Sequence, residues 1–307
     1  MAIGCNVYLW SAAEQDLLIS ACIGGLAREL FVAGACDRFT CERFDARGPH
    51  VMAIFGASPE AHAEVEARIA GAITAHFSRV PSAEVPSAEA LAARHAGCKG
   101  VTLCSVDAEP GLATPGSYRI FAHPDDRYPF ALTTGAAREA SIWRLRTELA
   151  LWAIGQLEAG RKSATAAAVR WVAAVDRAFV EAGRPRAAHW GYMVGRIVPD
   201  LARRVASDAG MHHDLLSLVG EANRATFGRV FERAEVSAHG GCDLPRLLDE
   251  ILAEDGRSLE QRQNLLRSTV HVTLQLLGVL TGLQLPLLMF AWAAALASEG
   301  ASPEAST

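Results

Sequence analysis

The fold is decided by residues 37 to 56, which read DRFTCERFDARGPHVMAIFG. Polar and apolar residues alternate along the first half, DRFTCERFD, as they do in a strand with one buried face. Gly48-Pro49 then breaks the chain, and HVMAIFG is a short apolar strand. The stretch therefore predicts a β-hairpin in which His50 opens the inner strand.

Around this hairpin the sequence predicts an N-terminal α/β portion over residues 1–134. A β-α-β-β-α-β order, which resembles a ferredoxin-like unit, is expected from the alternation and the helical spacing of apolar residues. The expected elements are a strand (3–10), a helix (11–33), the hairpin (37–56), a helix that starts at Ser58-Pro59-Glu60 and ends near Phe77, and a strand (117–121).

The chain after residue 134 is almost wholly helical in pattern. We expect helices at 136–159, 163–182, 186–208, 213–235, 243–254 and 258–297, the last broken at Pro286, and a disordered tail at 299–307. The predicted fold class is therefore α+β, with the α/β portion packed on a larger helical portion over 135–298.

Composition and charge exclude several classes of protein. Half of the residues are hydrophobic and 21% are charged, which is typical of a folded globular chain. The formal net charge is −5 and the arginines are dispersed among acids, so no nucleic-acid partner is expected. The seven cysteines form no C-x-x-C pair and no signal peptide precedes them, which predicts free thiols and a cytoplasmic location.

One apolar run, residues 265–297, is long enough to cross a bilayer. His271, Gln275 and Gln284 interrupt it, and no lysine or arginine anchors its end, so a buried helix is favoured over a membrane span. The same helix is a candidate interface for a homodimer.

Common cofactor and hydrolase motifs are missing from the sequence: no G-x-G-x-x-G, Walker loop, G-x-S-x-G or H-E-x-x-H occurs. We therefore expect no cofactor. The densest group of metal-ligand types is His212-His213-Asp214, but adjacent histidines on a helix point about 100° apart, so no metal site is expected.

The best candidate for proton transfer is His271, within the apolar helix RSTVHVTLQLLG. Arg267 and Gln275 lie four residues to either side and share its face. A histidine that faces a cavity there would have a lowered pKa, which suits acid or base catalysis near neutrality. The alternative is a hydrogen-bonded core histidine with no chemical role.

Two further segments carry candidate donors. In HPDDRYPFAL (123–132), Arg127 can bind a carboxylate or a peptide carbonyl and Tyr128 can deliver a proton; the alternative is a solvated surface turn. Tyr192, in HWGYMVGR (189–196), is a weaker candidate acid on an apolar helix.

Four motifs in this order resemble the stand-alone proteins related to the C-terminal domain of lantibiotic dehydratases, the thiopeptide-type bacteriocin biosynthesis proteins. They are VYLW followed by DLL (16–18), RFDARGPHVMAIFG, DDRYPFAL and STVHVTLQLLG. The resemblance spans nearly the full chain and implies work on a leader-bearing ribosomal peptide. Members of this family either eliminate glutamate from glutamylated Ser or Thr, or join two dehydroalanines by a formal [4+2] cycloaddition that ends in a pyridine with loss of water and leader.

Departures from the family pattern favour the second reaction. Eliminating members carry arginines in an H-x-R-x-R pattern after G-P, and here those positions are Met52 and Ile54. The late helix has Gln275 and Leu276 in place of N-R, and RYPF replaces R-Y-G-G. Glutamate elimination needs cations to hold the leaving carboxylate, whereas a cycloaddition centre is neutral.

The resemblance thus implies a cofactor-independent, pyridine-synthase-like cyclase whose partner is a leader-bearing precursor peptide, together with other biosynthetic enzymes. The alternatives are a divergent glutamate-eliminating lyase and a non-catalytic scaffold that binds the leader. The expected catalytic residues are His271, Tyr128 and Tyr192, and the expected substrate-binding residues are Arg43, His50, Arg127, Arg267 and Gln275.

Overall fold

The computed structural model describes residues 2–44, 48–80, 87, 89, 113–123, 136–207, 212–232, 244–253, 258–279 and 281–300. The chain forms two compact units, Met1–Arg161 and Lys162–Thr307, and its class is α+β, as predicted. Helix α5 (Ala136–Glu158) belongs to the first unit, although it follows the boundary expected after residue 134.

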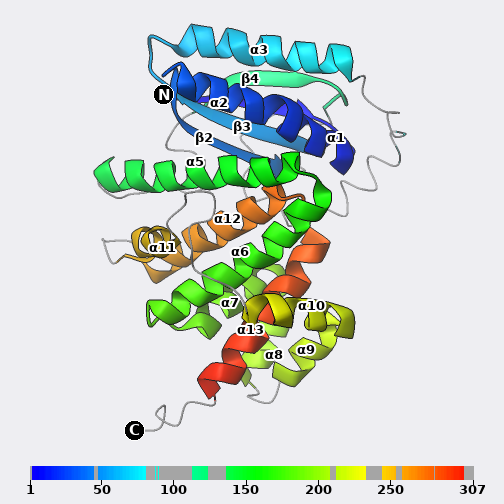
Figure 1. Cartoon of the computed structure of the whole chain (residues 1–307), viewed down its shortest axis with the longest axis vertical. Coiled ribbons are helices and arrows are strands. Elements are labelled where there is room, and N and C mark those ends of the chain that lie inside the picture. Colours follow the sequence, from blue (N-terminus) through cyan, green and yellow to red (C-terminus); the bar gives the residue numbers. More distant parts are fainter. Residues whose placement is uncertain are drawn as a thin grey trace. The chain divides into compact units, whose positions relative to one another are not determined.

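The first unit is built on a four-stranded antiparallel sheet of order β2-β3-β1-β4 (Figure 1). The strands are β1 (Ala2–Tyr8), β2 (Cys36–Phe44), β3 (His50–Ala57) and β4 (Tyr118–His123). The predicted hairpin is confirmed, because β2 pairs with β3 and Phe44 lies opposite His50. Gly48 adopts φ 107°, a left-handed conformation that favours glycine. The ferredoxin-like arrangement stays a prediction.

One long helical run follows β1, as predicted, but its middle turn is a π-helix. The run consists of α1 (Ala12–Leu18), η1 (Ile19–Ile23) and α2 (Gly24–Val32). Ser11 begins it with a capping box, since its hydroxyl accepts from the backbone while Glu14 reaches back to the Ser11 N–H.

Helix α3 (His62–Arg79) buries Val65, Ile69 and Ile73 on one face, as their spacing of four predicts. It starts later than predicted. Ser58 forms a turn with Ala61, whose backbone N–H bonds both the hydroxyl and the carbonyl of Ser58, and the helix begins after that turn.

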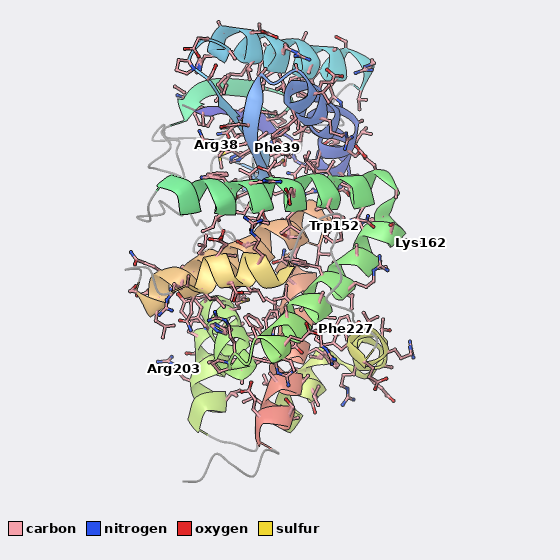
Figure 2. The ribbon with its side chains drawn as sticks, turned by 60° about the vertical axis from the view of Figure 1, so that its left-hand side comes forward. Arg38, Phe39, Trp152, Lys162, Arg203 and Phe227 are labelled. Carbon is pink, nitrogen blue, oxygen red and sulfur yellow. The ribbon has the colours of Figure 1, made fainter. Side chains whose placement is uncertain are left out.

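Helix α5 lies along the outer edge of β2, next to the labelled Phe39 in Figure 2. The Thr147 hydroxyl accepts from the backbone N–H of Phe39 at 3.0 Å and donates to its carbonyl at 3.1 Å. Both Thr147 and Phe39 are buried. A single side chain therefore satisfies the donor and the acceptor that this part of the edge strand would otherwise leave unpaired.

The second unit is helical (Figure 1). Its helices are α6 (Arg161–Glu181), α7 (Arg186–Ile197), α8 (Pro199–Ser207), α9 (His212–Val219), α10 (Glu221–Glu232), α11 (Leu244–Leu252), α12 (Leu259–Leu276) and α13 (Thr281–Gly300). The two long helices expected at 186–208 and 213–235 are each divided, the first before Pro199 and the second at Gly220, which has φ 82°.

The break expected at Pro286 is wrong. The last long run instead ends at Gly278, whose φ of 73° reverses the backbone after α12, and Pro286 lies inside α13. A proline near a helix start removes one N–H, whereas a left-handed glycine ends the helix. Within the part of the chain that the structure describes, no helix combines the length and apolarity needed to cross a membrane.

Buried polar contacts fix α7 against its neighbours. Asp176 on α6 accepts from the Trp190 indole at 2.8 Å and pairs with Arg186 at 2.8 Å. Glu299, near the end of α13, accepts from the backbone N–H of Arg186 at 2.8 Å, at the start of α7. Gly191 allows close packing, since a Cβ there would lie 3.0 Å from the Trp292 ring. These contacts hold α7 against α6 and α13, and both α7 and α13 also contact α12.

Candidate functional site

A line of four polar side chains runs along α12: Asn264, Arg267, His271 and Gln275. Their spacing of three, four and four residues puts them on one face of the helix. They are the only positions between 264 and 276 that are not buried. The rest of that stretch packs into the core of the unit, so between residues 264 and 276 a ligand can reach α12 only along this face.

His271 is held at both ring nitrogens. Its Nδ1 lies 2.7 Å from Gln284 Oε1 on α13, and its Nε2 lies 3.0 Å from Gln275 Nε2. Burial lowers the pKa of His271; the bond to Gln284 partly offsets this, and the Arg267 charge lowers the pKa further. The imidazole is therefore neutral near pH 7, so that one ring nitrogen carries a proton and the other can accept one.

Arg267 is a half-buried cation without a matching acid. Its Nε is buried and has no hydrogen-bond partner, and no carboxylate in the described parts of the chain pairs with it. Burial lowers its pKa, and the charge of Arg196 on α7 adds to this. On the neighbouring α7, the Tyr192 hydroxyl donates to Asn264 Oδ1 at 2.9 Å. Together with Tyr192, the polar side chains on this face of α12 form a cluster that can hold a carbonyl or a carboxylate.

The structure thus brings His271, Arg267, Gln275 and Tyr192 into one unit. Sequence reasoning missed two members of this cluster, Asn264 and Gln284. Gln284 carried a signal, because it is a polar residue in an apolar helix. Asn264 precedes Arg267 by three residues and shares its face.

The other described candidates, Arg43 and His50, lie in the first unit on opposite faces of the sheet, because Phe44 is opposite His50 and side chains alternate along β2. Arg43 pairs with Asp16 at 2.6 Å and bonds Gln15 at 3.3 Å.

His50 is 3% exposed, and its Nδ1 lies 2.9 Å from the Gly48 carbonyl oxygen. Its ring packs against the rings of Tyr8 and Phe44, at 5.0 and 5.7 Å between centroids. These contacts account for a structural role, and the expected part of Arg43 and His50 in substrate binding stays a prediction. Arg127 and Tyr128 lie outside the described residues.

Met52 and Ile54 lie in an apolar cluster with Ala2, and each of the two is 3% exposed. Phe44, Phe121 and Trp143 pack against this cluster. The two positions at which the family motif would place arginines are thus filled by buried hydrocarbon. A cation at position 52 would lose its hydration, and the buried acid opposite it, Glu42, is already paired with Arg146 at 3.7 Å.

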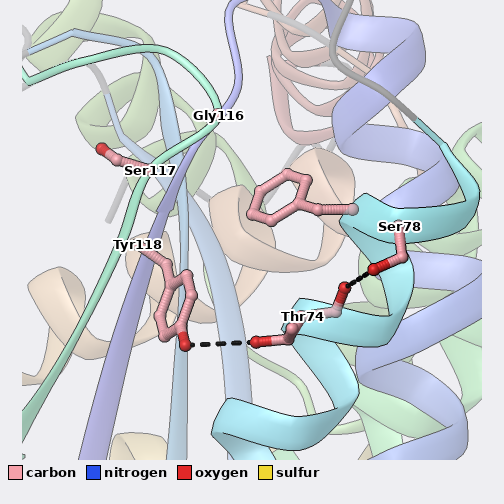
Figure 3. A pocket seen from close by; sticks show the side chains of 6 residues that line it. Thr74, Ser78, Gly116, Ser117 and Tyr118 are labelled. Atoms are coloured by element: carbon pink, nitrogen blue, oxygen red, sulfur yellow. Dashed lines mark hydrogen bonds between the residues drawn. The ribbon is translucent and has the colours of Figure 1, made fainter.

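An open pocket of about 540 Å³ lies in the first unit, between the end of α3 and the start of β4 (Figure 3). Its walls include Phe77 and Tyr118, and the Tyr118 hydroxyl lies 3.3 Å from Thr74 Oγ1. Tyr118 is the only ionisable residue among those that line it. The pocket contains none of the candidate residues.

Neither a group of metal ligands nor a reactive thiol is found among the described residues. No three His, Cys, Asp or Glu side chains in these ranges gather as metal ligands would. Cys5, Cys22, Cys36 and Cys41 are buried free thiols. Burial raises the pKa of Cys22 and of Cys36 to about 11, so neither is a ready nucleophile. The side chains of His212 and His213 lie outside the described residues.

The fold can be compared with those of known proteins. No family model matches the sequence, and no curated protein matches it. Among solved structures, the chain is similar to TbtD, the pyridine synthase from thiomuracin biosynthesis, with a TM-score of 0.62 and 17% identity over 97% of both chains.

It is also similar to MibB, a tRNA-dependent lantibiotic dehydratase from Microbispora sp. 107891, with a TM-score of 0.53 and 15% identity. That match covers 97% of this chain but 28% of the dehydratase. The resemblance to lantibiotic dehydratase-like, pyridine-synthase-like proteins, which the sequence motifs indicate, is thus confirmed at the level of the fold.

Proposed function

We propose that this protein matures a leader-bearing ribosomal peptide by a formal [4+2] cycloaddition of two dehydroalanines. Loss of water and of the leader peptide then yields a pyridine macrocycle. The observation that carries this proposal is the similarity to a pyridine synthase over 97% of both chains. The dehydratase, in contrast, is matched over a minor part of its length.

The apolar cluster around Met52 and Ile54 supports a cyclase over a glutamate-eliminating lyase. Elimination needs cations beside the departing glutamate carboxylate. Both side chains are buried against aromatic rings, so the β3 strand supplies no such cation here. A reaction between two neutral alkenes has no such requirement, and most of its acceleration can come from holding the alkenes together.

The remaining chemistry is proton transfer, and the neutral His271 suits its first step. To make the azadiene, His271 Nε2 takes the amide proton while a tyrosine hydroxyl protonates the carbonyl oxygen. The imidazolium then protonates the departing hydroxyl as water leaves, and the tyrosinate takes a proton from the ring CH₂ next to the imine carbon. To expel the leader, His271 takes a proton from the remaining ring CH₂ while the tyrosine hydroxyl protonates the leaving amide nitrogen, and the imidazolium then returns that proton to the tyrosinate. Tyr192 is the described candidate for the tyrosine, and Tyr128 is the other. Each group returns to its starting state.

The substrate is held by the remaining polar groups. Arg267 fits a peptide carbonyl or a leader carboxylate, because its buried Nε has no partner within the described residues. We assign Gln275, Arg43, His50 and Arg127 to substrate binding. The proposed partners are the precursor peptide and the enzymes that install its dehydroalanines. We also propose that the first unit has a ferredoxin-like arrangement.

Two peptide substrates separate the proposal from its alternatives. The purified protein is incubated either with a dehydroalanine-bearing precursor or with its glutamylated counterpart, and the products are followed by mass. Release of the leader from the first supports the cyclase, and loss of glutamate from the second establishes the lyase instead. A scaffold would bind both peptides and change neither mass.

The residue assignment has its own control. His271→Ala should stop turnover, whereas Arg177→Gln, at an exposed residue of α6 paired with Glu181, should not change it. Unchanged turnover in the His271 variant would refute the role of that residue.

A further inference from the structure

Gln284 differs from the other polar residues around His271 because it is completely buried, with 0% of its surface exposed. It lies near the start of α13, five residues after Val279, which ends the described part of the turn that follows α12. Both ends of its side-chain amide form hydrogen bonds. Oε1 lies 2.7 Å from His271 Nδ1, and Nε2 donates to the Val279 carbonyl at 2.6 Å.

The Val279 carbonyl determines which end of the Gln284 amide faces His271. A carbonyl oxygen can only accept, so the NH₂ group must point to Val279 and the Oε1 to the imidazole. The turn fixes that carbonyl, since the Val279 N–H bonds Leu274 O at 2.9 Å and Gly278 reverses the backbone. An inverted amide would bring two acceptors together at Val279.

An oxygen acceptor at Nδ1 selects one form of the neutral imidazole. Nδ1 must carry the proton, and the lone pair is then on Nε2. Gln275 Nε2 lies 3.0 Å from that lone pair and donates to it. Gln275 is partly exposed, whereas Gln284 is not. The contact of His271 with Gln284 is therefore shielded from solvent, whereas a ligand can reach the contact with Gln275.

We propose that Gln284 is a positioning residue that holds His271 as the Nδ1–H tautomer, and that Gln275 covers Nε2 until the peptide replaces it. The inference rests on the proposed function, in which Nε2 takes a proton from the peptide. Gln284 touches neither peptide nor reacting atoms. It acts by keeping the lone pair on the accessible side of the ring and the proton on the buried side.

The test reads the tautomer without any substrate. In the full-length protein labelled with ¹⁵N-histidine, the His271 ring nitrogens should show the Nδ1–H form. Gln284→Leu removes the acceptor and should shift the population towards the Nε2–H form. Gln275→Ala is the matched outer control and should leave the tautomer unchanged. Thermal melting identifies any variant that has not folded.

Turnover of the dehydroalanine-bearing precursor gives the second readout. Gln284→Leu should lower kcat by at least about tenfold. An unchanged Nδ1–H tautomer in Gln284→Leu would overturn the inference, and so would a lost tautomer with undiminished turnover. If the wild-type protein turns over no precursor, the proposed function fails, while the tautomer measurement still decides whether Gln284 sets the protonation of His271.

Discussion

His189 on α7 should make the stability of the second unit fall in mild acid. Its ring is stacked on Phe179, with centroids 4.9 Å apart and planes 11° apart. Its Nδ1 is buried and has no hydrogen-bond partner among the residues that the structure describes. Burial, with smaller contributions from the charges of Arg184 and Arg262, lowers the pKa of His189 from its ordinary value of 6.5 to about 4.

The size of the effect follows from these two pKa values. Between pH 4 and 6.5 the unfolded chain binds a proton at His189 and the folded chain does not, so acid favours unfolding. The full contribution is present above the unfolded pKa and is lost as pH falls toward the folded one. At about 1.4 kcal/mol per pH unit the loss reaches at most about 3 kcal/mol, of which about 2 kcal/mol is gone by about pH 5.

Urea unfolding followed by tryptophan fluorescence, at about pH 7 and about pH 5, measures this loss. His189→Phe keeps an aromatic ring on Phe179 and removes the titrating group. Burial also lowers the pKa of His76 and His271, but these groups are present in both proteins and cancel in the difference. The variant should lose about 2 kcal/mol less between the two pH values. Equal losses in the two proteins would refute this account of His189.

Three substitutions test other parts of the structure. Arg267→Met should raise the free energy of unfolding in urea by about 1 kcal/mol while lowering turnover, because it removes a buried donor without a partner; a destabilised variant would contradict this. Thr147→Val should cost about 2 kcal/mol in the same assay, since it strips both bonds from the Phe39 backbone, and Thr147→Ser should restore most of it. Met52→Arg should lower the midpoint of thermal unfolding by an amount equivalent to about 3 kcal/mol, because the acid opposite position 52, Glu42, is already paired with Arg146. Met52→Leu is the apolar control, and a neutral result would mean that Glu42 can compensate both cations.

The hairpin and the line of polar side chains on α12 could be predicted because both depend on local periodicity. Alternation with a Gly-Pro break identified β2 and β3, and spacing by four put Arg267, His271 and Gln275 on one face. The break at Gly278 was missed because sequence alone favours proline as the helix breaker. The left-handed glycine is the stronger signal, since it ends α12 whatever follows it.

The hydrogen bonds that surround His271 and its polar neighbours could not be predicted from the spacing of residues in the sequence. Gln284 reaches the imidazole only because the chain reverses after α12 and brings α13 beside it. The bond from Tyr192 to Asn264 joins residues far apart in sequence, and no local pattern records that pairing. Such contacts depend on the packing of helices, which the periodicity of one helix does not determine.

The central claim is that the protein closes a pyridine ring on a leader-bearing peptide. The most direct measurement is the mass of the core product after incubation with the dehydroalanine-bearing precursor. The account predicts a released leader and a core peptide lighter than the precursor by the leader and one water, in a yield that His271→Ala abolishes. A precursor of unchanged mass under conditions in which it binds, or a product that keeps its leader, would contradict it.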